Sequence, residues 1–239
     1  MSDLKRGISR RRVVKTGMAG ILATGVSPLI LSKGAWAQEF CNAPTGDTVT
    51  LGFNVPQTGA YADEGADELR AYQLAVEHLN GEGDGGLIPH FSSKTLTGNG
   101  ILGKRVEYVT GDTQTQSDPA RESARRMIER DGAVMITGGS SSGVAIAVQS
   151  LCQDMGVIFM AALTHSNDTT GKDKRKYGFR HFFNAYQSGV GLGPQLGAAY
   201  GNGRRAYHLT ADYTWGWTQK ESMIAATEAL GWETVETVR

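Results

Sequence analysis

Short apolar segments alternate with amphipathic ones along most of this 239-residue chain. Of all its sequence features, this alternation most strongly restricts the folds that the chain can adopt. Strand-like segments are expected at 48–55, 104–110, 133–137, 157–161, 178–184, 204–210 and 232–238. Helix-like segments are expected between them, at 66–80, 118–131, 144–155, 189–200 and 217–230, with a long irregular loop at 81–103. Strands joined by helices of this length form right-handed βαβ units. The sequence therefore predicts an α/β fold with doubly wound parallel sheets.

The first 37 residues have the pattern of an export signal. Arg10, Arg11 and Arg12 precede an interrupted apolar run, and Ala35 and Ala37 place small residues before Gln38. The run is too short for a permanent membrane helix, which needs about 20 apolar residues. We expect a twin-arginine signal at 1–37, cleaved after Ala37, a short leader at 38–47, and a periplasmic protein exported by the twin-arginine translocase.

Charge and cysteine content restrict the possible classes of function and the possible covalent cross-links. Residues 1–37 contain seven of the 24 basic and one of the 24 acidic side chains, so the remainder carries 17 against 23, a net charge of −6. This balance argues against a nucleic-acid surface. Cys41 and Cys152 permit a disulfide in an oxidising compartment, and a buried Cys152 beside a free Cys41 is the alternative.

The loop at 138–143 is the strongest candidate for ligand binding. It reads Gly-Gly-Ser-Ser-Ser-Gly between a buried strand and a helix. Glycines allow close approach of a ligand, and serine hydroxyls with free helical amides attract an anion such as a carboxylate or a phosphate. A helix capped by serine, with no ligand, is the structural alternative.

The same loop also matches the G-x-S-x-G pattern of a serine hydrolase, with Ser141 as nucleophile. That chemistry needs a later acid and histidine. His165, His181 and His208 follow, but the order leaves little room for the acid, and no oxyanion loop of the HGGG type precedes the pattern. An exported hydrolase is therefore an alternative function.

Three further loops supply polar or aromatic side chains. The loop after the first strand carries Thr58, Tyr61 and Glu64, and it lacks a dinucleotide fingerprint. The loop after 157–161 carries Thr164 and His165, although a single histidine there is more often an ordinary loop residue. Segment 212–217 holds a tyrosine and two tryptophans, which line either a cleft or a packed turn. No group of residues has metal-ligand spacing, so no metal or other cofactor is predicted.

From Thr48 onward the chain resembles the periplasmic binding proteins of type I, in the branch that serves ABC transporters of branched-chain amino acids and amides. The resemblance rests on the order and spacing of several short motifs, at 57–65, 74–77, 80–81, 103–109 with Asp112, 136–143 and 156–160. It implies two α/β lobes that close on a small ligand by a hinge motion. We assign 48–184 to the N-terminal part of the first lobe and 185–239 to the start of the second.

The resemblance also implies roles for particular residues. Ser141 and Ser142 match the serine donors that hold the ligand carboxylate, and Thr164 or His165 matches a residue that contacts its polar groups. Trp215 stands where the family often has a tyrosine against the ligand. Glu64 would lie at the mouth of the cleft, with Tyr61 on the same loop. Segment 184–188 has no carboxylate where the family often has one for the ligand ammonium, so an amide or another carboxylate ligand remains open.

The expected function is capture of a small carboxylate, amino acid or amide for an ABC transporter membrane permease, without catalysis. A ligand-sensing domain that reports to a receptor is a further alternative. Family members continue well beyond the position of Arg239, so the sequence resembles the leading part of the first lobe and only the opening of the second, and we expect a chain truncated at its C-terminus.

Overall fold

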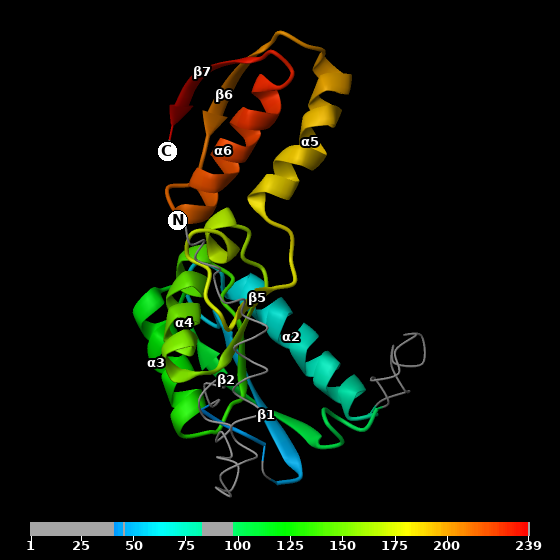
Figure 1. Cartoon of the computed structure of the whole chain (residues 1–239), viewed down its shortest axis with the longest axis vertical. Helices are drawn as coiled ribbons and strands as arrows, with labels where there is room; N and C mark the ends of the chain where they lie inside the picture. Colours follow the sequence, from blue (N-terminus) through cyan, green and yellow to red (C-terminus); the bar gives the residue numbers. More distant parts are fainter. Residues whose placement is uncertain (1–40, 45, 83–97, 239) are drawn as a thin grey trace, which may run out of the picture. The chain divides into compact units, whose positions relative to one another are not determined.

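The computed structural model describes residues 41–44, 46–82 and 98–238, and its larger sheet has five parallel strands. Their spatial order is β2-β1-β3-β4-β5 (Figure 1). The strands are β1 (Thr48–Val55), β2 (Arg105–Asp112), β3 (Met135–Gly138), β4 (Ile158–Ala161) and β5 (Gly178–Arg180). This parallel, crossover-connected order confirms the predicted α/β class.

Helices cover both faces of this sheet (Figure 1). Helix α2 (Ala62–Leu79) lies on one face, and α3 (Ser117–Glu129) and α4 (Ser142–Met155) lie on the other. Side chains alternate along a strand, so Leu51 and Phe53 of β1 pack with Val76 of α2. Gly52 faces the opposite way, where an added Cβ would meet Met127 and Ile136.

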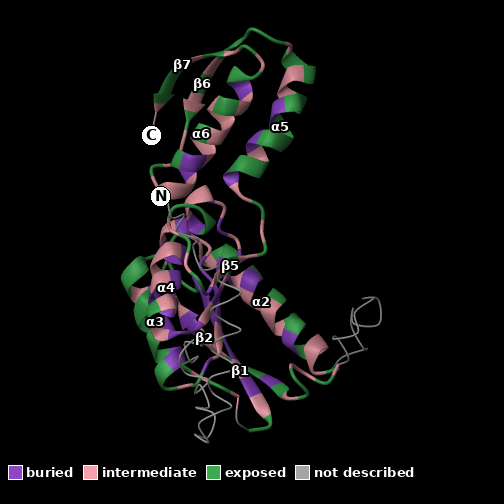
Figure 2. Ribbon diagram, viewed as in Figure 1, coloured by how far each residue is buried: buried purple, intermediate pink, exposed green. Residues whose placement is uncertain are grey.

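The main core lies on the α3–α4 face. Fourteen buried side chains form this cluster, including Met127, Ile136, Leu151 and Phe159 (Figure 2, purple). Ala120, Ala124 and Ala145 are fully buried within it and allow the helices to approach the sheet closely. Burial of these apolar faces is the main favourable contribution to this layer, at roughly 25 cal/mol per Å² of apolar surface.

Helices α2 and α5 show the largest differences from their predicted starts. Helix α2 starts at Ala62 and α5 at Ala185, each four residues before the expected start. For α5 the reason is a capping box, in which Asn184 accepts from the Gln187 amide and Gln187 accepts from the Asn184 amide. The expected loop at 81–103 lies largely outside the described residues.

A second, two-stranded parallel sheet follows. It consists of β6 (Arg205–Leu209) and β7 (Glu233–Val238), with α5 (Ala185–Tyr200) and α6 (Thr214–Glu228). Helices α5 and α6 pack closely at Gly189. An added Cβ there would lie only 2.6 Å from the Ser222 carbonyl oxygen, so the close approach requires glycine. Helix α6 starts three residues before its predicted start, so Trp215 and Gly216 lie in its first turn.

The two cysteines are not joined. Cys41 is exposed and Cys152 is buried, and both thiols are free, so the structure has the alternative that the sequence offered and not the disulfide. Cys152 points into the α3–α4 core, where burial raises the pKa of its thiol to about 12. The backbone amide of Cys41 donates to the Gly156 carbonyl at 3.2 Å.

The expected export signal, with its cleavage site after Ala37, lies outside the described residues. Within the described part of the chain, no helix combines the length and apolar character needed to cross a bilayer.

Candidate functional site

The strand register brings three loops to one edge of the five-stranded sheet. Asn54 near the end of β1 is paired with Gly138 at the end of β3, and Gly138 is paired with Ala161 at the end of β4. Because parallel strands end at the same edge, the loops that follow them are neighbours. This edge is the predicted location of the binding site.

The loop between β3 and α4 presents an open helix N-terminus. Ser141 is the N-cap residue, and its side chain forms no capping hydrogen bond. The first hydrogen bond of the helix runs from the Ala145 amide to the Ser141 carbonyl at 2.9 Å. The amides before Ala145 therefore have no helical acceptor, and with the helix dipole they attract an anion.

Ser140, one residue earlier, bonds to a buried acid that the sequence reasoning missed. Its hydroxyl donates to Glu68 of α2 at 2.7 Å. Glu68 also accepts from Tyr72 at 2.5 Å and is only 6% exposed. A signal was present in the sequence, because Glu68 lies three residues after Gly65 and four before Tyr72, on the buried face of the helix.

Not every apolar residue of α2 lies on this buried side of the helix. Leu74, within the expected helix 66–80, is 50% exposed. The face that packs on β1 and β2 runs through Leu69, Tyr72, Val76 and Leu79. Leu74 lies two residues from both Tyr72 and Val76, about 200° around the helix from each, and so faces solvent.

Asp112 at the end of β2 fixes the loop that follows β1. One of its oxygens accepts from the amides of Gln57 (2.9 Å), Thr58 (3.1 Å) and Gln114 (2.9 Å). The other accepts from the Thr58 hydroxyl at 2.7 Å. Desolvation acts to raise the pKa of Asp112, but these hydrogen bonds outweigh it and the pKa is lowered.

We expect Asp112→Asn to lose stability at neutral pH. The native pKa of Asp112 lies below its unfolded value of about 3.9, so its contribution is present above that pH and is lost as the pH falls through the native pKa. The site is largely open to solvent, so the loss at pH 7 should be below about 1 kcal/mol. Urea unfolding at pH 7 and pH 3 should show a larger difference at pH 7 than at pH 3. Asp154→Asn, an exposed carboxylate on α4, is the control, and an equal loss at both pH values would contradict this account.

Two of the predicted ligand contacts use their hydroxyls inside the protein. Ser142 is 2% exposed, and its hydroxyl accepts from the Ser166 amide at 3.2 Å. Thr164 is fully buried, and its hydroxyl lies 3.3 Å from that of Thr169. Both residues therefore support the loops at this edge from within.

His165 is half-buried among aromatic rings. Its ring centroid lies 4.8 Å from that of Phe182 and 4.5 Å from that of Phe183. Burial, followed by the nearby charge of Arg180, lowers the pKa of His165, which favours the neutral ring at neutral pH. Its Nε2 atom is buried and has no hydrogen-bond partner.

The loop after β1 meets the start of α6 through aromatic side chains. The hydroxyls of Tyr61 and Tyr213 lie 3.0 Å apart. The Tyr213 ring centroid lies 5.9 Å from that of Trp215, and both residues are half-buried. Burial and the bond to Tyr61 raise the pKa of Tyr213, so its hydroxyl is neutral at physiological pH. The structure thus brings Tyr61 and Trp215, two of the predicted contacts, into one aromatic group.

The loop after β4 is hydrogen-bonded to the start of α6, mostly through hydroxyl groups. Ser166 and Thr214 have their hydroxyl oxygens 2.9 Å apart, and Thr218 donates to Ser166 at 3.4 Å. The Asn167 amide donates to the Thr218 hydroxyl at 3.2 Å, and Thr214 donates to Asp168 at 2.8 Å. These bonds place the first turn of α6 against the loop that follows β4.

Glu64 is exposed and lines a hollow of about 390 Å³ beside the α4 turn. The hollow lies between α2 and the loop after β4, and its lining includes Glu68, Tyr72, Leu163 and His181. Its size falls within the range of small-molecule sites. Glu64 and the buried Glu68 therefore face the same space.

The described residues contain no nucleophile–base pair of the kind that a serine hydrolase at Ser141 would need. In the ranges 41–44, 46–82 and 98–238, no histidine forms a hydrogen bond with Ser141. His181 bonds instead to the Ala161 carbonyl at 3.2 Å. An activated serine requires a base within hydrogen-bond reach.

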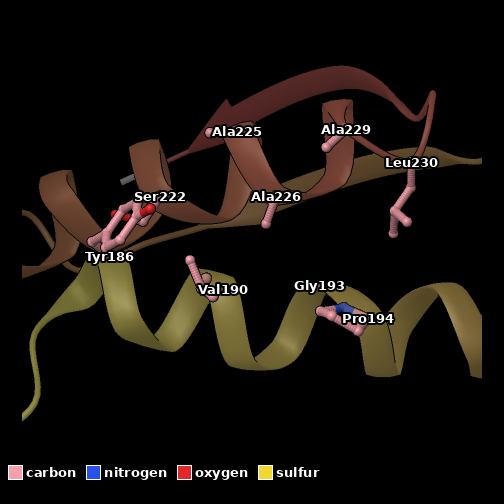
Figure 3. A pocket seen from close by; sticks show the side chains of 10 residues that line it. Tyr186, Val190, Gly193, Pro194, Ser222, Ala225, Ala226, Ala229 and Leu230 are labelled. Atoms are coloured by element: carbon pink, nitrogen blue, oxygen red, sulfur yellow. The ribbon is translucent and has the colours of Figure 1, made fainter.

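A larger hollow, about 470 Å³, lies between α5 and α6 (Figure 3). In Figure 3 Tyr186, Val190 and Pro194 of α5 lie across from Ser222, Ala226 and Leu230 of α6. Two side-chain hydroxyls line it, and that of Ser222, beside Tyr186, already donates to the Thr218 carbonyl at 2.7 Å. The rest of the lining is apolar and none of it is charged, so this hollow suits an anion less well than the α4 turn does.

A family model described as periplasmic binding protein matches residues 48–239. The chain belongs to the periplasmic binding protein family. This periplasmic binding protein is 28% identical over 115 residues to "Leu/Ile/Val-binding protein homolog 7" of Brucella abortus, and equally to that of Brucella suis. The match covers 48% of this chain and 25% of the Brucella protein.

Solved structures share its fold. A solute-binding protein of an ABC transporter from Rhodopseudomonas palustris, in complex with 3,4-dihydroxybenzoic acid, has a TM-score of 0.66 at 24% identity. A branched-chain amino acid transporter substrate-binding protein from Streptococcus pneumoniae, in complex with isoleucine, has a TM-score of 0.64 at 19% identity. The comparisons cover 81% and 80% of this chain but 47% and 49% of those chains, so this chain spans about half of each solved relative.

Proposed function

We propose that this chain is part of an extracytoplasmic solute-binding protein that captures a small carboxylate for an ABC importer. The observation that carries the proposal is the uncapped N-terminus of α4, with the Ser141 side chain beside its free amides. The family match and the solved relatives with isoleucine and a dihydroxybenzoic acid support a ligand with a carboxylate. Amino acids, aromatic acids and related amides are the ligand classes to test.

In this proposal the ligand carboxylate accepts from the α4 amides and from the Ser141 hydroxyl. Trp215 covers the apolar part of the ligand, with Tyr61 beside it and Glu64 at the mouth. Ser142, Thr164 and His165 hold the surrounding loops. In the same proposal, residues 48–184 are the N-terminal part of the first lobe and 185–239 are the start of the second, and closure of the lobes traps the ligand.

The partners follow from the same proposal. The loaded protein would dock on the membrane permease of an ABC transporter, after export by the twin-arginine translocase to the periplasm and cleavage after Ala37. A receptor-linked sensing role would use the same binding site, and only the identity of the docking partner separates the two.

We expect Ser141→Ala to weaken carboxylate binding about 10- to 100-fold, which corresponds to the roughly 1.5–3 kcal/mol of a hydrogen bond to a charged group. Isothermal titration calorimetry on the protein expressed from its complete reading frame, with isoleucine, leucine, 4-hydroxybenzoate and 3,4-dihydroxybenzoate, measures this. Ser117→Ala, an exposed serine at the start of α3, is the matched control.

Unchanged affinity of Ser141→Ala for every ligand that binds would refute the assigned site. Failure of the wild-type protein to bind any carboxylate would refute the proposed ligand class.

A further inference from the structure

Glu68 is a buried carboxylate connected directly to the proposed ligand site. It lies in the middle of α2 and bonds through one oxygen to Tyr72 of its own helix, at 2.5 Å. Through the other oxygen it accepts from the Ser140 hydroxyl at 2.7 Å. Ser140 is the residue directly before Ser141, so one side chain separates the buried acid from the N-cap of α4.

No basic side chain neutralises Glu68. Across the described ranges, no ion pair involves it. Burial raises its pKa, and the hydrogen bonds from Tyr72 and Ser140 and the charge of His181 oppose that rise only in part. A buried acid with hydrogen bonds but no cation is costly in its ionised form.

The groups around Glu68 come from three parts of the fold. On α2 these are Tyr72, held neutral because burial and the charge of Glu68 raise its pKa, and the exposed carboxylates of Glu64 and Asp67. The β3–α4 loop contributes the uncharged Ser140. The segment after β5 contributes His181, an exposed imidazole on the same hollow. A carboxylate arriving at α4 would add a further negative charge, which favours protonation of Glu68.

Protonation would reverse the bond between Glu68 and Ser140. A serine hydroxyl has one hydrogen, and in the structure that hydrogen goes to the Glu68 carboxylate. Once Glu68 carries a proton taken from solvent, its O–H can donate to the Ser140 oxygen. The Ser140 hydrogen is then free to turn toward an anion at the start of α4.

We propose that Glu68 is a positioning residue for the anionic end of the ligand: it orients the Ser140 hydroxyl and takes up a proton when a carboxylate binds. This inference rests on the proposed function, because it needs a carboxylate at the α4 turn. It assigns the site a preference for carboxylates that increases as the pH falls.

The test is calorimetric titration with 4-hydroxybenzoate and isoleucine, whose carboxylates stay ionised between pH 6 and 8. Measurement in two buffers of different ionisation enthalpy gives the number of protons taken up on binding. We expect the wild-type protein to take up part of one proton and to lose affinity as the pH rises, by at most about tenfold per pH unit. Glu68→Gln, whose amide can donate to Ser140 permanently, should bind with no such uptake and with an affinity independent of pH.

Two further variants keep the test decisive. Glu77→Gln removes an exposed carboxylate from the same helix and should behave as the wild-type protein. Ser140→Ala leaves Glu68 in place and should weaken binding most at low pH, where the released hydroxyl would act. It also serves as the test if Glu68→Gln does not fold.

Equal proton uptake by the wild-type protein and Glu68→Gln would overturn the role of Glu68. So would a loss of affinity in Glu68→Gln, or in Ser140→Ala, that is the same at every pH, since that is the signature of a purely structural residue. Absence of carboxylate binding by the wild-type protein would overturn the proposed function itself, and this inference with it.

Discussion

Gly138→Ala is expected to destabilise the protein by about 3 kcal/mol or more. Gly138 ends β3 with φ at +123°, a conformation that side chains rarely adopt, and an added Cβ would overlap the carbonyl oxygen of Asn54 on β1. That oxygen accepts from the Gly139 amide at 3.1 Å, so any shift also disturbs the loop that leads to Ser141. Urea unfolding followed by circular dichroism would measure the loss.

Gly132→Ala separates the two causes. Gly132 also has a positive φ, +74°, but nothing lies within 4 Å of the position of an added Cβ. Only backbone strain applies there, and it costs about 1–2 kcal/mol. Equal losses in both variants would mean that the contact with Asn54 is relieved without cost and that the β1–β3 edge is less tightly packed than the structure shows.

Phe159→Ala is expected to cost about 3–5 kcal/mol. Phe159 is the largest of the fully buried side chains, and it packs from β4 into the α3–α4 core. Its removal loses apolar burial and leaves a cavity that the surrounding side chains fill only in part. Because small domains have a total stability of about 5–15 kcal/mol, this variant should unfold at a clearly lower urea concentration.

Phe179→Ala on the neighbouring strand β5 is the matched control. Phe179 is 48% exposed, so its truncation removes little buried surface and should change stability by less than about 1 kcal/mol. A loss as large as that of Phe159→Ala would show that β5 is covered in solution by a segment that buries Phe179.

The fold was predictable because its signal is local and repeated. Strand β1 was predicted with its observed bounds, and every other strand of both sheets was predicted to within a few residues. The helix starts were harder, because α2 begins with a polar turn that resembles a loop and α5 begins at a capping box whose partners are Asn184 and Gln187. Leu74 is 50% exposed although it is apolar, so apolar character alone does not say which helix residues meet the sheet.

The candidate site was predictable only where it depends on a loop's own sequence. The Gly-Ser loop before α4 was found in this way, and the structure places Ser141 at the helix N-cap. Glu68 was missed because one acid in an amphipathic helix resembles a solvent-exposed residue. The contact between Asp112 and Thr58 joins residues 54 positions apart, and it depends on the pairing of β1 with β2, which no local pattern reveals.

The bonds between α6 and the loop after β4 are almost all between uncharged groups. Ser166, Asn167, Thr214 and Thr218 contribute hydroxyls and amides, and Asp168 is the one charged partner. Such bonds exchange readily with water and are barely screened by salt. The contact between α6 and the loop after β4 should therefore have nearly the same strength at low and at high salt concentration.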